Sequence, residues 1–194
     1  MAATRSAVVH SGVGIAKKRE RGIVSEDFRG EYHQKVDSKA RVSIPAAFRK
    51  VLDAGDPPSA EYPRTRIVMV YGGSNRQFVE CYTQRDADAL ARLVRKLPMG
   101  SKKRMLAERD LITRSLTVEI DDDGRIVLPQ KVRDKIKFGD ARETTFAGAL
   151  DRFMIWRRDT YEAVYDAVEE DEDSLLDGGD VLSLLGDLDA DAEA

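Results

Sequence analysis

Short apolar and polar stretches recur twice, in the same order, between residues 30 and 165. Alternation of apolar and polar positions is typical of half-buried strands. In the first half it predicts strands at 31–36, 41–44, 66–71 and 77–82, with a helix at 46–52. In the second half it predicts strands at 116–120, 125–128, 143–147 and 152–156, with a helix at 130–138. The pattern therefore predicts two successive β-turn-β-α-β-β units and an α+β fold.

The two units share a short phrase. Residues 37–49 read DSKARVSIPAAFR and residues 121–133 read DDDGRIVLPQKVR, an offset of 84. A second pair, GSNRQFVEC at 73–81 and GALDRFMIW at 148–156, is offset by 75. Such self-similarity indicates a tandem duplication. A Pro- and Gly-rich loop at 53–64, present only in the first copy, accounts for the change of offset because loops tolerate insertions.

Apolar residues at helical spacing predict further helices at 85–97, 102–114 and 160–168. We therefore divide the chain into five segments. They are a flexible extension (1–27), a first module with a trailing helix (28–100), a connecting helix (101–115), a second module with a C-terminal helix (116–168) and an acidic, disordered tail (169–194). Each module is close to the lower size limit for an independent core, so we expect the copies to pair with each other or with another chain.

The charge is distributed unevenly along the chain. The net charge is −3, but residues 160–194 contain 13 acidic residues and no Lys or Arg. Residues 1–159 therefore carry all 32 Lys and Arg against 22 Asp and Glu, a net charge of +10. A basic body is typical of a polyanion-binding protein, and an acidic tail can screen such a body or serve only as a solvated end.

Several classes of protein find no support in the sequence. One cysteine, Cys81, excludes an intrachain disulfide, and we expect it to be a buried structural thiol. No run of about 18 apolar residues and no signal peptide is present, which favours a cytoplasmic protein without membrane contact. His10 and His33 are the only histidines, and there is no phosphate-binding glycine loop or nucleophile elbow. We expect no catalytic residue, no metal site and no cofactor.

Each repeated phrase places an arginine directly after a tight turn. In the first turn, Lys35, Lys39 and Arg41 are suited to a DNA groove, because Lys binds phosphate and Arg can donate two hydrogen bonds to guanine. Asp37 is positioned to hold Arg41 in one conformation. The alternative is that the Asp–Arg pair closes the turn and binds no ligand.

The second turn is acidic. Asp121, Asp122 and Asp123 precede Arg125 and would repel phosphate unless nearby cations, such as Arg114, Lys131 and Arg133, offset them. This run lacks the alternating ligands and closing Glu of a calcium loop. The second copy is therefore expected to be mainly architectural, or to supply Arg125 to a weaker contact.

The two phrases, together with the closing GALDRFMIW, resemble the MraZ family, bacterial two-copy relatives of the AbrB-like swapped-hairpin transcription factors. The resemblance covers residues 28–165. It implies two AbrB-like modules that form a swapped-hairpin β-barrel within one chain. It also implies a ring-shaped homo-oligomer, of octamer or dodecamer class, that binds double-stranded DNA. The resemblance further implies a cytoplasmic, nucleoid-associated regulator of the division and cell-wall gene cluster, which binds GTG-containing direct repeats in its own promoter region.

The family motif D-x-x-x-R implies DNA contact, and here it falls on Asp37 and Arg41 and on Asp121 and Arg125. The family usually has Gly before this Arg, but the first copy has Ala40. If the turn requires a positive φ, Ala40 costs about 1 kcal/mol. A second hypothesis is an antitoxin-like protein-interaction module of the AbrB type. A small barrel enzyme lacks catalytic residues.

Overall fold

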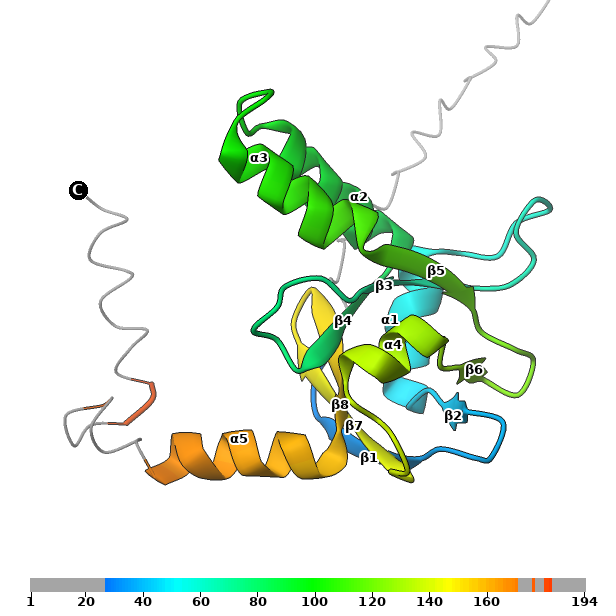
Figure 1. Ribbon diagram of the computed structural model, residues 1–194. Helices are drawn as coiled ribbons and strands as arrows, with labels where there is room; N and C mark the ends of the chain where they lie inside the picture. Colours follow the sequence, from blue (N-terminus) through cyan, green and yellow to red (C-terminus); the bar gives the residue numbers. More distant parts are fainter. Residues whose placement is uncertain (1–26, 171–175, 177–179, 183–194) are drawn as a thin grey trace, which may run out of the picture.

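The computed structural model describes residues 27–170, 176 and 180–182 (Figure 1). The expected extension lies outside these residues except for Asp27, and so does most of the expected tail. The elements follow in the order β1 Glu31–Lys35, β2 Arg41–Ser43, α1 Ala46–Gly55, β3 Arg66–Val70, β4 Phe78–Tyr82, α2 Gln84–Arg95, α3 Lys102–Ala107, the π-helical η1 Glu108–Thr113, β5 Ser115–Glu119, β6 Arg125–Val127, α4 Gln130–Lys135, β7 Glu143–Ala149, β8 Arg152–Arg157 and α5 Arg158–Glu170. The predicted α+β class is confirmed, with antiparallel sheets.

The strand order of the sheets reflects the sequence duplication. The larger sheet has the order β1-β7-β8-β4-β3-β5, and β2 pairs with β6 in a separate two-stranded ribbon. The counterparts in the two copies are β1 and β5, β2 and β6, β3 and β7, and β4 and β8. Exchanging each strand of the larger sheet for its counterpart gives the same strand order in reverse. Four of the pairings, β1–β7, β2–β6, β3–β5 and β4–β8, join one copy to the other. The expected pairing between copies is therefore confirmed within a single chain.

The strand registers follow the same pseudo-twofold relation. In the ribbon, Arg41 pairs with Val127 and Ser43 pairs with Arg125, and an offset of 84 exchanges these two pairs. Buried core positions repeat with that offset as well, as in Val36/Ile120, Val42/Ile126, Ile44/Leu128, Phe48/Val132 and Leu52/Ile136. The offset found in the sequence thus relates equivalent core positions.

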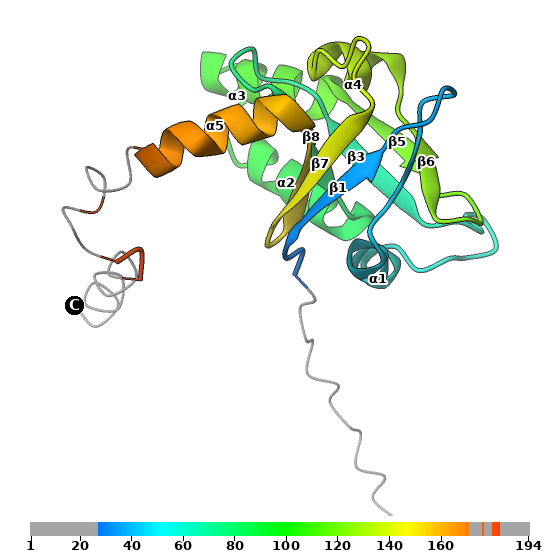
Figure 2. The same ribbon diagram turned by 90° about the horizontal axis from the view of Figure 1, so that it is seen from below.

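The expected closed barrel is not seen among the described residues. The larger sheet ends at β1 and β5, and the ribbon lies next to these edges without a continuous ladder (Figures 1 and 2). β1 meets β2 at a single bridge, Val36–Val42, and through the turn that joins them. β5 meets β6 through the turn bond from Asp121 N to Arg125 O. The ladder breaks because each tight turn redirects the chain after one or two pairings.

One hydrophobic core serves both copies. Its buried side chains come from the strands of both copies and from α1 and α4. The rings of Phe28, Phe48 and Phe153 meet with centroids 5.0 to 5.4 Å apart. Cys81 lies in the same core, and burial raises the pKa of its thiol well above the ordinary value, as expected of a structural cysteine.

Several predicted helices differ in extent from those observed. The helix expected at 130–138 ends at Lys135, because Lys137 (φ 51°) and Gly139 (φ 50°) turn the backbone and place Phe138 in the core. The connecting helix changes from α3 to the π-helical η1. Together with α2, these segments form a helical hairpin beside β3 and β5, whereas α5 leads away from β8 (Figure 1).

Candidate nucleic-acid interface

The first turn, residues 37–40, is organised by the carboxylate of Asp37. Its Oδ1 accepts hydrogen bonds from the backbone N–H groups of Lys39 (2.8 Å) and Arg41 (2.9 Å). Its Oδ2 accepts from Nε of Arg41 at 2.7 Å. These bonds, first among them the one from the Arg41 backbone N–H, hold the pKa of Asp37 below its ordinary value. The result is a turn whose arginine is fixed through Nε.

The second turn, residues 121–124, repeats this arrangement atom for atom. Oδ1 of Asp121 accepts from the backbone N–H groups of Asp123 (3.0 Å) and Arg125 (2.8 Å). Oδ2 accepts from Nε of Arg125 at 3.2 Å. The backbone N–H of Arg125 is again the largest cause of a lowered pKa, here that of Asp121. The D-x-x-x-R phrase therefore specifies one local structure in both copies.

The last residue of each turn adopts a left-handed backbone conformation. Ala40 has φ 59° and Gly124 has φ 74°. The carbonyl of Ala40 accepts from Leu128 N at 2.8 Å, and that of Gly124 accepts from Ile44 N at 2.9 Å. Each turn is thus hydrogen-bonded to the strand of the other copy. The positive φ that makes Ala40 costly is present, because the first turn keeps the geometry of the second.

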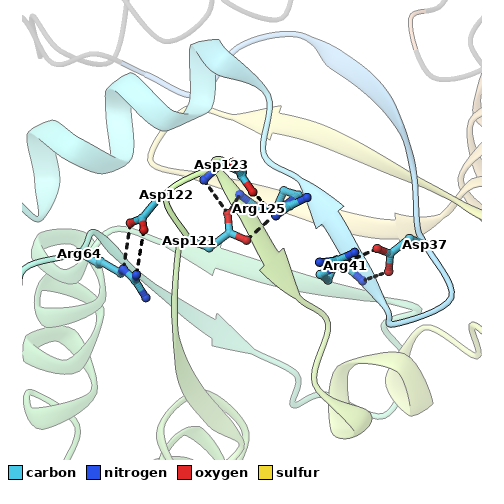
Figure 3. A network of polar contacts seen from close by, with 7 residues as sticks. All are labelled: Asp37, Arg41, Arg64, Asp121, Asp122, Asp123 and Arg125. Carbon is cyan, nitrogen blue, oxygen red and sulfur yellow. Dashed lines mark hydrogen bonds and ion pairs between the residues drawn. The ribbon is translucent and has the colours of Figure 1, made fainter.

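The two arginines lie on the same exposed face of the β2–β6 ribbon (Figure 3). Val42 and Ile126 point into the core, so their neighbours on either side point outward. The outward face consists of Arg41 opposite Val127 and of Ser43 opposite Arg125. Arg41 and Arg125 are diagonal neighbours on this face, and such residues are about 7–8 Å apart.

The charges around the two arginines differ. In the described part of the chain, the terminal nitrogens Nη1 and Nη2 of Arg41 have no hydrogen-bond partner. Nη2 of Arg125 is paired with Asp123. Asp122 accepts two bonds from Arg64, at 3.2 and 3.1 Å (Figure 3). The first arginine therefore has free donors, and the second belongs to a cluster of three aspartates and two arginines.

The cations beside the second turn are not those that the sequence suggested. Arg114 lies 3.4 Å from Asp110, and Lys131 lies over the ring of Tyr71. The neighbours of the acidic turn are instead Arg64 and Arg49, whose Nη1 would lie 2.1 Å from a Cβ added at Gly124. Arg64 ends the inserted loop, and only its tertiary placement connects it with a turn 58 residues away.

Arg133 also lies elsewhere than expected. It donates to the carbonyl of Leu128 at 2.9 Å and lies beside the first turn. An open groove of about 380 Å³ separates this turn from the segment after α4, and its lining consists of Asp37, Ser38, Lys39, Ala40, Arg133, Phe138, Gly139 and Arg142. The first turn thus gains cations from the second copy. Lys35, at the exposed end of β1, belongs to the same end of the molecule.

The described residues offer little for other chemistry. They contain no group of three or more His, Cys, Asp or Glu side chains arranged to hold a metal ion. No helix among them has the length and apolar character needed to cross a membrane. Exposed His33 forms a hydrogen bond of 3.0 Å with the hydroxyl of Thr145, and its Nε2 lies 3.3 Å from Oε1 of Glu31.

Comparison with known proteins places the chain in a family. Residues 111–176 match the family described as "MraZ protein, putative antitoxin-like". A Cereibacter sphaeroides protein named "Transcriptional regulator MraZ" is 50% identical over 167 residues, which cover 84% of this chain and 97% of that protein. The chain belongs to the MraZ family. A Ruegeria member of the same name is 45% identical over 81% of this chain and 94% of its own length.

More distant MraZ proteins share the name. The Roseiflexus castenholzii member is 30% identical over 73% of this chain and 89% of its own length. These relatives are named as transcriptional regulators. The resemblance inferred from the two D-x-x-x-R phrases is therefore confirmed at the level of the MraZ family, and both phrases form hydrogen-bonded turns in this member.

Proposed function

We propose that this chain is a sequence-specific DNA-binding transcriptional regulator. The observation that supports this most strongly is the pair of aspartate-fixed arginines on one exposed face of a two-stranded ribbon. The major groove of B-DNA admits such a ribbon. The proposed contact residues are Lys35, Asp37, Lys39, Arg41, Asp121 and Arg125.

In this proposal the residues of the first turn have different roles: Arg41 contacts a base, Asp37 positions Arg41, and the lysines contact phosphates. Asp37 binds Nε of Arg41 and leaves Nη1 and Nη2 free, so the guanidinium can donate two bonds to O6 and N7 of guanine. Because Asp37 fixes Arg41 in advance, less conformational freedom is lost on binding. Lys35 and Lys39 flank this side chain and bind phosphates. Arg125 makes a weaker contact, since Asp123 competes with DNA for its Nη2.

The wider architecture is also a proposal. The interleaved strands and the ribbon between β1 and β5 are consistent with a swapped-hairpin barrel that has little continuous pairing along two seams. In this proposal the modules are 28–100 and 116–168, joined by 101–115, and the segments 1–27 and 169–194 lie outside the DNA-binding body. Several copies assemble into a ring that binds direct repeats upstream of the division and cell-wall genes, in the cytoplasm and on the nucleoid.

The test is binding of the full-length chain to DNA from upstream of its own gene, measured by fluorescence anisotropy beside a scrambled fragment. We expect preference for the upstream fragment and a loss of about 5- to 150-fold in Arg41→Ala, since a bidentate Arg–guanine pair contributes about 1–3 kcal/mol. Arg109→Ala is a matched control, because Arg109 makes an exposed ion pair with Asp110 away from the ribbon.

Two results would contradict the proposal. One is equal affinity for the upstream and scrambled fragments, and the other is unchanged affinity in Arg41→Ala. A native mass measurement at the binding concentration tests the ring, which a monomer would exclude. A stable 1:1 complex with a second protein, without DNA binding, would instead favour the antitoxin-like hypothesis.

A further inference from the structure

Val127 is unusual on the outward face of the ribbon. It is 52% exposed, whereas Ile126 beside it in β6 and Val42 in β2 are each 1% exposed. It lies on the face that carries both fixed arginines, directly opposite Arg41. An outward-facing position of a strand whose other face is buried ordinarily carries a polar side chain, so this valine offers an apolar contact beside Arg41.

The pseudo-twofold counterpart of Val127 is Ser43, which lies opposite Arg125. The side chain opposite the arginine therefore differs between the two halves of the ribbon face. The free arginine has an apolar neighbour, and the neutralised arginine has a hydroxyl neighbour. Because the backbones of the two halves correspond, this difference comes from the side chains alone.

We propose that Val127 is a specificity-determining residue that contacts the C5-methyl group of a thymine in the major groove. The inference rests on the proposed DNA-binding function and assigns a base contact beyond the D-x-x-x-R residues. Thymine is the only base of B-DNA that presents a methyl group in this groove, and apolar side chains recognise it there. A valine side chain can neither neutralise a phosphate nor donate a hydrogen bond, so the thymine methyl is the feature that fits.

The spacing places this contact next to the guanine bound by Arg41. Directly opposed Cβ atoms in an antiparallel pair are about 4.5–5.5 Å apart. Successive bases along one DNA strand rise by about 3.4 Å. Val127 therefore faces a base pair one or two steps from the one that Arg41 contacts. Ser43 lies at the corresponding place beside Arg125 and can bond to any base pair.

The experiment removes the thymine methyl group from the DNA and the Val127 methyl groups from the protein, separately and together. Each thymine of the upstream fragment is replaced in turn by deoxyuridine, which lacks only the C5-methyl group. Binding is then measured for the unmodified chain and for Val127→Ala, with Val127→Thr, which keeps one methyl, as a second variant. We expect the unmodified chain to lose about fourfold in affinity at one thymine of each bound repeat, the factor for burying about one methylene.

The decisive result is the coupling between the two changes. Val127→Ala should bind the unmodified fragment about fourfold more weakly and should show no further loss at the sensitive thymine. The affinity and the thymine sensitivity of Val127→Thr should lie between those of the unmodified chain and those of Val127→Ala. Val164→Ala, which shortens an exposed valine of α5, and Ser43→Ala should retain the full sensitivity of the unmodified chain at that thymine.

The proposal is overturned if Val127→Ala binds as tightly as the unmodified chain, or if it loses affinity but remains equally sensitive to deoxyuridine. A change in native mass with no coupling would show that Val127 contacts another copy of the chain instead, and would also overturn it. These failures differ from failure of the DNA-binding function, which would appear as loss of binding, or loss of its dependence on Arg41, in the unmodified chain.

Discussion

The two D-x-x-x-R turns have the same backbone and different electrostatic surroundings. Each has an aspartate that accepts two backbone bonds and one Nε bond, and each ends in a left-handed residue. Around the first turn lie Lys39 and Arg133, whereas the second contains three aspartates held by Arg64 and Arg125. The repeated D-x-x-x-R phrase therefore fixes the local backbone geometry of both turns. The charged residues around each turn set the electrostatic potential that a ligand encounters there.

The largest effect should come from giving the first turn the residues of the second. Ser38→Asp combined with Lys39→Asp should weaken DNA binding by more than about tenfold, because phosphate is repelled. The slope of log affinity against log salt should become shallower by about 0.9 for the lost Lys39 contact. Anisotropy titrations at several salt concentrations measure both. Unchanged affinity would show that the first turn does not meet DNA.

The next effect concerns the residue that ends each turn. Gly124→Ala should destabilise the fold by about 1–2 kcal/mol, because it adds left-handed strain and its Cβ displaces the end of the Arg49 side chain. The reverse change, Ala40→Gly, should stabilise the fold by up to about 1 kcal/mol, since Ala40 has φ 59°. Urea denaturation of both variants tests this. Equal effects of the same sign would contradict it.

The reciprocal transplant should act in the opposite direction to the first. Asp122→Ser combined with Asp123→Lys gives the second turn the residues of the first and frees Nη2 of Arg125. We expect tighter DNA binding by a few fold, with a salt slope steeper by about 0.9 for one added phosphate contact. If affinity falls or stays constant, the second turn lies away from the DNA.

A smaller effect should follow from removing Arg64. Its ion pair with Asp122 is exposed, and exposed pairs contribute about 0.2–1 kcal/mol. Arg64→Ala should therefore change stability by less than about 1 kcal/mol but should weaken DNA binding measurably, because Asp122 loses its counter-ion. Arg85→Ala, which removes another exposed pair, is the control. A loss of several kcal/mol would show that Arg64 anchors the inserted loop.

The smallest effect is on pH dependence. Both Asp37 and Asp121 have pKa values below the ordinary 3.8, so their stabilising bonds are fully present above that pH and are lost as the pH falls through the lowered values. Carboxyl carbon NMR titration should find both midpoints below 3.8. Since the backbone N–H of Arg41 is the largest cause for Asp37, Arg41→Ala should keep part of the lowering. An ordinary midpoint would mean that the turn bonds do not persist in solution.

Much of the secondary structure could be predicted from the sequence, because it depends on the periodicity of apolar residues and on local turn residues. The strands, the short helices after Pro45 and Pro129, and the offsets of 84 and 75 follow from periodicity and turn residues. The early end of α4 at Lys135 was missed, because burial of Phe138 overrides the helical pattern. The change to the π-helical η1 was also missed, since the bonding of a helix depends on its packing.

The candidate site was only half predictable. Both Asp–Arg pairs were expected, and each has the proposed holding contact. Arg114, Lys131 and Arg133, named from the sequence as cations able to offset the second turn, lie against other groups instead. Val127 was absent from the prediction, since a strand valine in sequence looks like a core residue.

By itself, the sequence determined the duplicated β-turn-β-α-β-β pattern, the membership of the MraZ family and the inequality of the two turns. These depend on residue identity and on contacts within a few positions. Tertiary structure alone decided that the copies interleave, that Arg64 neutralises Asp122, and that Val127 stands beside Arg41 on the open face. Those relations join residues 45 to 116 positions apart, and long-range pairing is selected by burial of the shared core, which local pattern does not encode.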